Sequence, residues 1–291
     1  MRGEALKKRE MMADFNEKMK IALFGTCRIG SFRHHFDCTD FDEAVSYVHS
    51  TKEIIQLLKY ITKQVEIPDS INRFCFRAGI LSLQPVAYSD RFLSQFHEAD
   101  LFVIEVCARR KYLYQGYYLH HLAVDKRLHY YRDTPEKIMK DTLVQYQTQE
   151  EIEKDVSEIM DLVSPRKILL VSHINATIDA PRSLPQMVCD AVTGAAQSAS
   201  SRILPKRPRK KAVPHVITIG KRAELISLLR ETAQKKGISF FDPTVALERY
   251  PQEEILETES PGLPPGHYTP TGEKVMGLLY SEEVRKIMEC R

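Results

Sequence analysis

The sequence predicts an α/β protein with a doubly wound parallel sheet and helices on both faces, a three-layer α/β/α arrangement. Two observations carry this prediction. Short apolar runs typical of buried strands recur along the chain, at residues 20–24, 74–80, 100–107, 167–172 and 238–241. Segments with helical spacing separate these runs at distances that suit right-handed crossovers between parallel strands. With 291 residues, of which 43% are hydrophobic, the chain can bury the core of one large domain.

The first half of the chain alternates strand and helix. The strand at residues 20–24 runs into a glycine, and a helix is predicted from Arg28 onward. Residues 41–61 are predicted to be helical because their apolar residues fall at helical spacing, namely Ile54, Ile55, Leu57, Leu58 and Ile61. Residues 100–107 are the clearest buried strand, a continuous apolar run with one embedded acid, Glu105.

The second half continues this alternation. Residues 134–162 contain two helical stretches, and Thr134-Pro135 is a suitable start for the first. An amphipathic helix is predicted at residues 223–236, closed by Gly237 as its C-cap. The last helix is predicted at residues 273–288. Each helix lies between two strands or after the last one, as a doubly wound sheet requires.

The chain is predicted to hold a single α/β domain over residues 20–291, preceded by a flexible, charged tail at residues 1–19. An excursion from the sheet is expected near residues 110–165. A basic, proline-containing loop at residues 202–211 resembles a nuclear-localisation or polyanion-binding patch. Such runs are usually solvated loops, so a nucleic-acid partner is not expected.

The excursion contains an aromatic segment, residues 112–131, with six tyrosines and the histidines His120, His121 and His129. Aromatic residues interleaved with histidines suit a sugar-stacking rim or a metal patch, and they also suit a half-exposed helical face. Because no carboxylate partner is evident in the sequence, no metal is expected here.

Charge and cysteine content bear on the partners and the cellular location expected for the protein. A net charge of +3 neither requires nor excludes a polyanionic partner. The six cysteines are scattered without metal-binding or disulfide spacing, at positions 27, 38, 75, 107, 189 and 290. Reduced thiols, the lack of a signal-peptide core and the lack of a membrane-length apolar run predict a cytoplasmic protein without a membrane partner.

Polar residues follow most of the predicted strands. In a doubly wound sheet these positions share the carboxyl edge, where ligands bind. The segments are Gly25-Thr26-Cys27, Arg77-Ala78-Gly79, Glu105 to Arg109, His173-Ile174-Asn175 and Asp242-Pro243. A helix N-terminus beside Arg28 would favour the thiolate of Cys27, and His267, in a Pro/Gly-rich loop before the last helix, could act as its base. Structural alternatives are a small core residue for Cys27 and a helix cap for His267.

Two short blocks give a family resemblance. Gly25-Thr26-Cys27 after a strand resembles the Gly-Asp-Ser block of the SGNH/GDSL hydrolase superfamily, with cysteine in the place of serine as in its GSCFA-motif branch. His267, Thr269 and Gly272 are similar to the superfamily's last block, in which an acid precedes the histidine. Pro264 stands in the position of that acid, so Glu257, Glu259 and Asp242 are the alternative acids.

The resemblance implies an SGNH-like fold over residues 20–290 and a Cys27–His267 dyad. It implies hydrolysis or transfer of an ester-linked acyl group without a cofactor, on a small molecule or glycan, and family analogy favours a carbohydrate. An acyl donor is implied for the transfer reaction. The oxyanion and substrate residues that it implies, together with neighbouring strand-end groups, are Gly79, Arg109, Arg28, Glu105, His173 and Asn175.

Three of these assignments carry their own alternatives. In the superfamily, an asparagine of a third conserved block donates a hydrogen bond to the oxyanion. Arg109 stands near the place of this asparagine and could supply charged donors to an oxyanion or bind an anionic substrate. Glu105 and Arg109 could equally form a structural ion pair. His173 is a second candidate base, and it could instead be bonded to a backbone group.

Two other functions fit the same residues. Cys27 to Arg33 satisfies the C-x5-R pattern of cysteine phosphatases, although Ile29 and Phe32 are bulky for a phosphate-binding loop. The loop also resembles a P-loop but lacks its lysine. A degenerate hydrolase fold used only for binding is the third possibility, favoured by Pro264 and by the missing third-block asparagine.

Overall fold

The computed structural model describes residues 19–38, 47–126, 129–175, 215–257 and 267–289. Its centre is a parallel sheet of five strands in the order β2-β1-β3-β7-β8. The strands are β1 (Lys20–Phe24), β2 (Asp37–Cys38), β3 (Leu101–Val106), β7 (Lys167–Ser172) and β8 (Ser239–Phe241). The predicted strands at residues 20–24 and 167–172 are confirmed to the residue.

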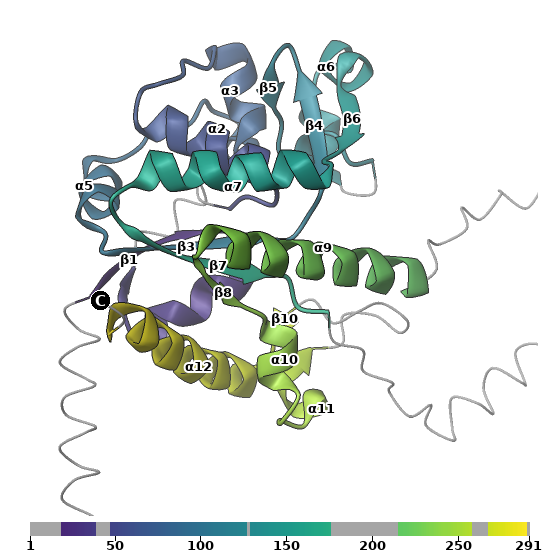
Figure 1. The fold of residues 1–291 in the computed structure, drawn as a ribbon. Helices are drawn as coiled ribbons and strands as arrows, with labels where there is room; N and C mark the ends of the chain where they lie inside the picture. Colours follow the sequence, from purple (N-terminus) through teal and green to yellow (C-terminus); the bar gives the residue numbers. More distant parts are fainter. Residues whose placement is uncertain (1–18, 39–46, 127–128, 176–214, 258–266, 290–291) are drawn as a thin grey trace, which may run out of the picture.

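Helices cover both faces of this sheet, which confirms the predicted three-layer α/β/α fold class (Figure 1). On one face Ala22 and Phe24 of β1 join a core with the helices α2 (Thr51–Ile61), α3 (Asp69–Cys75), α4 (Arg77–Ser82), α5 (Asp90–Glu98), α7 (Gln149–Val163) and α9 (His215–Lys236). On the other face Ile21 and Leu23 join a core with the 3-10 helix η1 (Cys27–His34), α10 (Pro243–Leu247), α11 (Gln252–Ile255) and α12 (Pro270–Glu289). Alternate side chains of β1 therefore pack into two separate hydrophobic cores.

A second, antiparallel sheet occupies the excursion, with strand order β5-β4-β6. Its strands are β4 (Arg110–Tyr114), β5 (Tyr117–Tyr118) and β6 (Leu143–Tyr146). Between β5 and β6 lie η3 (His121–Ala123), η4 (His129–Asp133) and α6 (Glu136–Asp141). The two predicted helical stretches of residues 134–162 correspond to α6 and α7. The aromatic segment forms strands and 3-10 turns, and the helical-face interpretation of it is wrong.

The predicted strand at residues 74–80 is wrong, because this segment belongs to α3 and α4. Gly79 shows why two short helices fit here: a Cβ on it would lie 2.6 Å from the Cα and the carbonyl oxygen of Arg73. The two helices can approach this closely only with glycine at that point. An apolar run of this length suits a strand and a buried helix equally, so periodicity cannot separate them.

The remaining helix boundaries differ modestly from the predictions. Residues 41–61 contain α2, which Ser50 caps through its side chain, while residues 39–46 lie outside the described part. Cys27 opens a 3-10 helix in place of the expected α-helix. Helix α9 ends before Gly237, whose φ of +65° supports its role as the C-cap. The tail at residues 1–18 and the basic loop at residues 202–211 are outside the described residues.

Within the described part of the chain, no helix combines the length and apolar character needed to cross a membrane.

Candidate active site

The loop after β1 is built around a close approach to β3. A Cβ on Gly25 would lie 2.5 Å from Cβ of Glu105, so glycine is required where the two strands leave the sheet. The carbonyl of Gly25 accepts from the amide of Val48 at 3.1 Å. This bond brings residues 47–49 alongside the end of β1, where Gly25 and Tyr47 form an isolated parallel bridge.

Glu105, at the end of β3, fixes this loop through hydrogen bonds. Its side chain is 1% exposed and accepts three hydrogen bonds: from the amide of Thr26 at 2.7 Å, from Thr26 Oγ1 at 2.5 Å and from Arg28 Nε at 3.1 Å. Burial, the largest single influence, lowers the pKa of Arg28, but Glu105 together with smaller contributions from Cys107, Cys27 and Tyr268 raises this pKa above its usual range. Glu105 and Arg28 thus form a buried ion pair that fixes the residues on both sides of Cys27.

Cys27 is half-buried at the first position of η1, and Tyr47 Oη donates to its Sγ at 3.7 Å. The guanidinium of Arg77 lies over the Tyr47 ring, 4.4 Å from its centroid. Burial, and then the neighbouring Cys27, raise the pKa of the Tyr47 hydroxyl, so it keeps its proton at neutral pH and acts as a donor. Tyr47 follows no sequence pattern and was not predicted.

The other described thiols are disfavoured as nucleophiles. Burial raises the pKa of Cys38 to about 12. Burial also raises the pKa values of Cys75 and Cys107. Cys189 and Cys290 lie outside the described residues.

His267 lies on β10 (His267–Tyr268), which pairs antiparallel with β9 (Leu256–Glu257) and packs near η1. Tyr268 turns inward and is buried, whereas His267 is exposed. Burial raises the pKa of Tyr268, and the charges of Arg28 and Cys27 act on it. The segment at residues 267–272 therefore approaches the segment at residues 25–28 through Tyr268, and His267 is the exposed residue just before Tyr268. Glu257 stands directly opposite His267 in the register of β9 and β10.

The threonine and glycine after His267 have structural roles. Thr269 Oγ1 accepts from the amide of Gly272 at 3.0 Å, which caps the start of α12. A Cβ on Gly272 would lie 2.0 Å from the carbonyl oxygen of Ile255, so α12 can pack on α11 only with glycine there. Two of the three residues that match the superfamily's last block, Thr269 and Gly272, therefore act in helix capping and packing.

Arg109 and Glu105 do not pair with each other. Arg109 directs Nε and one terminal nitrogen at the carbonyl of Gln147, at 3.0 and 2.8 Å, and a second terminal nitrogen lies 3.9 Å from Glu224. The ion pair of Glu105 is with Arg28, which corrects the alternative that joined it to Arg109. The sequence could not separate the two arginines because both lie within four residues of a strand end.

His173 and Asn175 follow β7, two strands from β1 in the sheet. His173 is buried and its Nδ1 lies 2.7 Å from the carbonyl oxygen of Ile174, the backbone bond expected of a structural histidine. Burial first, then Arg28 and Arg222, lower the pKa of His173 well below its usual range. With the proton on Nδ1, its Nε2 is the basic nitrogen. The amide of Asn175 donates to Thr244 Oγ1 at 2.8 Å.

Three of the remaining expectations meet a different geometry. Gly79 lies inside α4, where its role is to admit α3. Residues 27–34 form a 3-10 helix with Ile29 and Phe32 buried and Arg33 exposed, which is not the open anion-binding loop of a C-x5-R phosphatase. Asp242, one of the alternative acids, caps α10 and pairs with Arg230 at 2.6 Å.

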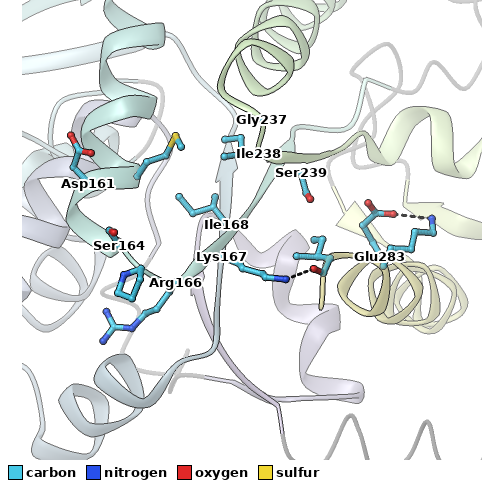
Figure 2. Close-up of a pocket in the computed structure, with 13 residues that line it drawn as sticks. Asp161, Ser164, Arg166, Lys167, Ile168, Gly237, Ile238, Ser239 and Glu283 are labelled. Atoms are coloured by element: carbon cyan, nitrogen blue, oxygen red, sulfur yellow. Dashed lines mark hydrogen bonds and ion pairs between the residues drawn. The ribbon is translucent and has the colours of Figure 1, made fainter. Parts of the chain in front are cut away.

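A pocket lies at the opposite edge of the sheet (Figure 2). It is lined by Lys167 at the start of β7 and by Gly237 and Ile238 just before β8. Three of its charged groups are engaged, because Lys167 Nζ donates to the carbonyl of Ile287 at 2.6 Å and Glu283 pairs with Lys286. This amino edge is remote from Cys27, which follows the carboxyl end of β1.

The fold and these strand-end residues define an α/β domain with a candidate nucleophile at the carboxyl edge of its sheet. A model of one family, the TviD N-terminal domain, matches residues 19–138 and 210–280, more than half of the chain. The chain therefore belongs to the TviD N-terminal domain family.

A curated relative is the Vi polysaccharide biosynthesis protein TviD of Salmonella typhi, 22% identical over 289 residues. The alignment covers 86% of this chain but only 29% of the relative, so the chain spans less than a third of that protein's length.

Solved structures similar to this chain include the M. smegmatis aryl esterase, with 12% identity, a TM-score of 0.36 and coverage of 92% of this chain and 99% of that one. The carbohydrate acetylesterase Est24 from Sinorhizobium meliloti has 11% identity, a TM-score of 0.36 and the same coverage. The acetylxylan esterase Axe2 from Geobacillus stearothermophilus has 8% identity, a TM-score of 0.36 and coverage of 92% and 95%.

Proposed function

We propose that this domain hydrolyses or transfers an ester-linked acyl group on a carbohydrate, with Cys27 as nucleophile and His267 as general base. One observation carries the proposal: the loop around Cys27 is fixed by a buried ion pair, and a protonated tyrosine hydroxyl donates to its sulfur. Such a preorganised thiol has the features of an activated nucleophile. The polysaccharide setting of the curated relative supports a carbohydrate substrate.

The reaction divides into two steps. His267 removes the Cys27 proton, and the thiolate attacks the acyl carbonyl carbon, forming a C–S bond and an oxyanion. The oxyanion collapses, the C–O bond to the donor alcohol breaks, and the imidazolium returns the proton to that alcohol. In the second step water or a sugar hydroxyl attacks the thioester, which releases free Cys27 and either the acid or the acylated sugar.

Glu257 is the acid that we propose for orienting His267. Directly opposed residues on antiparallel strands carry their side chains on one face, with Cβ atoms about 4.5–5.5 Å apart. Glu257 has this relation to His267, and both are exposed. Asp242 is engaged by Arg230, and Glu259 lies outside the described residues. A carboxylate at Glu257 would fix the imidazole tautomer that presents a basic nitrogen to the thiol.

Hydrolysis of an activated aryl ester tests the proposal. We expect Cys27→Ala and His267→Ala to abolish turnover, because each removes a group that reacts or moves the proton. Cys27→Ser should retain more activity than Cys27→Ala, since serine is the superfamily's usual nucleophile. His34→Ala and Cys38→Ala are matched controls on η1 and β2. Turnover that survives both Cys27→Ala and His267→Ala would contradict the assignment, and His173→Gln would then test the second base.

Trapping the acyl-enzyme separates catalysis from binding alone. A peptide containing Cys27 should gain the mass of the acyl group after brief exposure to the ester, and graded alkylation should label Cys27 before Cys38, Cys75 and Cys107. If aryl phosphate turns over instead, and Arg33→Lys stops it, the phosphatase alternative is correct. If neither substrate turns over above the Cys27→Ala background, the domain only binds.

A further inference from the structure

Three histidines from two distant segments of the sequence converge beside the candidate site. His49 lies in the loop before α2, and His120 and His121 lie at the start of η3 in the excursion. One ring nitrogen from each lies within 4.8 Å of the others. The ring centroids of His49 are 5.0 Å from His120 and 4.3 Å from His121, and those of His120 and His121 are 4.5 Å apart.

Two nitrogens of this cluster are buried without a hydrogen-bond partner among the described residues, His49 Nδ1 and His120 Nε2. His120 is completely buried. Buried polar groups are normally bonded, and unbonded ones call for a ligand, an ion or a water. His49 Nδ1 faces the Glu53 carboxylate at 3.7 Å, so the completely buried His120 Nε2 is the nitrogen that points to a bound species.

The backbone holds the cluster in place. The carbonyl of His49 accepts the amides of Cys107 and Ala108 at 3.0 and 2.9 Å, which ties it to the end of β3. The amide of His120 donates to the carbonyl of Phe74 at 2.9 Å. The imidazoles are thus carried by anchored segments, as a preorganised ligand set requires.

We propose that His49, His120 and His121 bind a divalent transition-metal cation, with zinc as the first choice, and leave a fourth coordination position open. Imidazole suits zinc, copper and nickel, whereas magnesium and calcium take oxygen ligands. Three histidines with one open position are a donor set of catalytic zinc sites. Zinc–nitrogen bonds of about 2.0–2.1 Å would place the three nitrogens about 3.4 Å apart, so nitrogens that lie within 4.8 Å of one another must approach further on binding.

Glu53 supplies the outer partner that such a site uses. Its buried carboxylate accepts the amide of His49 at 3.1 Å and Ser50 Oγ at 3.2 Å, and it lies 3.7 Å from His49 Nδ1. Binding through His49 Nε2 would direct Nδ1–H at Glu53, the carboxylate–histidine–metal arrangement. No carboxylate partner for a metal is evident in the sequence around His120 and His121, and the fold provides Glu53 from α2.

Binding also has an opposing contribution. His120 Nδ1 accepts the amide of Leu122 at 3.3 Å, and ligation through Nε2 would place a proton on Nδ1 and give up this long bond. The guanidinium of Arg77 is a cation that acts on His120, and it stacks on the intervening Tyr47 ring. The Tyr47 ring centroid is 5.4 Å from that of His49 and 6.3 Å from that of His120. The side chain of Tyr47 therefore lies between the histidine cluster and Cys27.

Metal titration of the chelator-treated full chain tests the site without reference to ester turnover. We expect one equivalent of Zn²⁺ per chain. Co²⁺ should give the intense visible absorption of a four-coordinate ion without a thiolate charge-transfer band. His121→Ala, at a half-buried position, should weaken binding by more than about 100-fold, and Glu53→Gln by about 10- to 100-fold. His129→Ala removes an exposed histidine of the same excursion and should leave binding unchanged.

Three results would overturn the proposal. The folded wild-type chain could take up no stoichiometric Zn²⁺ or Co²⁺. Binding could persist unchanged in both His121→Ala and His49→Ala. A thiolate band could appear and vanish in Cys27→Ala, which would assign the metal to the cysteine. Circular dichroism of each variant confirms that a loss of binding is not a loss of fold.

Discussion

Two buried carboxylates in different parts of the molecule, Glu105 and Asp155, have the same kinds of hydrogen-bond partner. Glu105 is 1% exposed at the end of β3 and accepts from Thr26 and Arg28. Asp155 is completely buried on α7 and accepts from Thr51 Oγ1 and Lys52 Nζ, both at 2.6 Å. Each carboxylate has a threonine hydroxyl, a cation and one further donor, which for Asp155 is Gln147 Nε2 at 2.7 Å.

The two carboxylates differ in what they hold. Glu105 fixes the loop that carries Cys27, whereas Asp155 ties α2 to α7 and to the end of β6. The side chain of Arg28 is 11% exposed and that of Lys52 is 20% exposed, so the cation near the site is more completely buried. A buried, fully bonded carboxylate is therefore not a sign of function in itself. Its consequence depends on the segment it positions.

Glu105→Ala should have the largest effect. It leaves the Arg28 guanidinium buried without its counter-charge and frees the Thr26 amide, so the free energy of unfolding should fall by about 3–5 kcal/mol. Ester turnover per folded molecule should be lost, because the Cys27 loop is no longer fixed. Urea denaturation and turnover on the same samples measure both effects. Full activity in a destabilised Glu105→Ala would break the comparison.

Asp155→Ala should destabilise the chain by about 3 kcal/mol, because it removes charge-assisted bonds from three partners. Lys52 reaches solvent more easily than Arg28, so its unpaired charge is less costly. Ester turnover per folded molecule should stay at the wild-type level, since these bonds do not touch the Cys27 loop. A loss of turnover in proportion to that of Glu105→Ala would show that the two regions are coupled.

Gly25→Ala sharpens the comparison at the Glu105 side. Its Cβ would lie 2.5 Å from Cβ of Glu105 and 3.0 Å from Oε2, so overpacking should cost about 2 kcal/mol and displace the carboxylate. Gly30→Ala is the matched control on η1, since nothing lies within 4 Å of its added Cβ, and it should be neutral or slightly stabilising. Equal melting temperatures for the two variants would contradict the close approach.

The sequence predicted the parts of this site that rest on short-range pattern. The continuous apolar runs predicted both ends of β1 and of β7 correctly. Because the carboxyl ends of parallel strands share one edge of the sheet, the sequence also placed the Cys27 loop and Glu105 at the same edge. Other parts depend on tertiary contacts. Residues 74–80 were predicted as a strand because seven apolar-rich residues fit either element, and only the approach of Gly79 to Arg73 decides between them. Tyr47 and His49 carry no local signal. The pairing of this segment with Gly25 brings Tyr47 to Cys27, and His49 is bonded to the end of β3.

The smallest predicted effect uses a matched pair of threonines. Thr26→Val and Thr51→Val each keep the side-chain shape and remove one hydroxyl bond to a buried carboxylate, so Thr26→Val should lower the free energy of unfolding by about 1 kcal/mol. Thr51→Val should lower it somewhat more, because the Thr51 hydroxyl also accepts from Gln147 Nε2 at 2.7 Å. Glu105 keeps the Thr26 amide and Arg28 as donors, and Asp155 keeps Lys52 and Gln147. Both chains should therefore stay folded, and their turnover can be compared directly. Only Thr26→Val should lower ester turnover, because Thr26 precedes Cys27 and its hydroxyl bond sets the direction of the loop. If Thr51→Val lowers turnover equally, the carboxylate on α7 positions the site as well, and position in the fold would not separate the two.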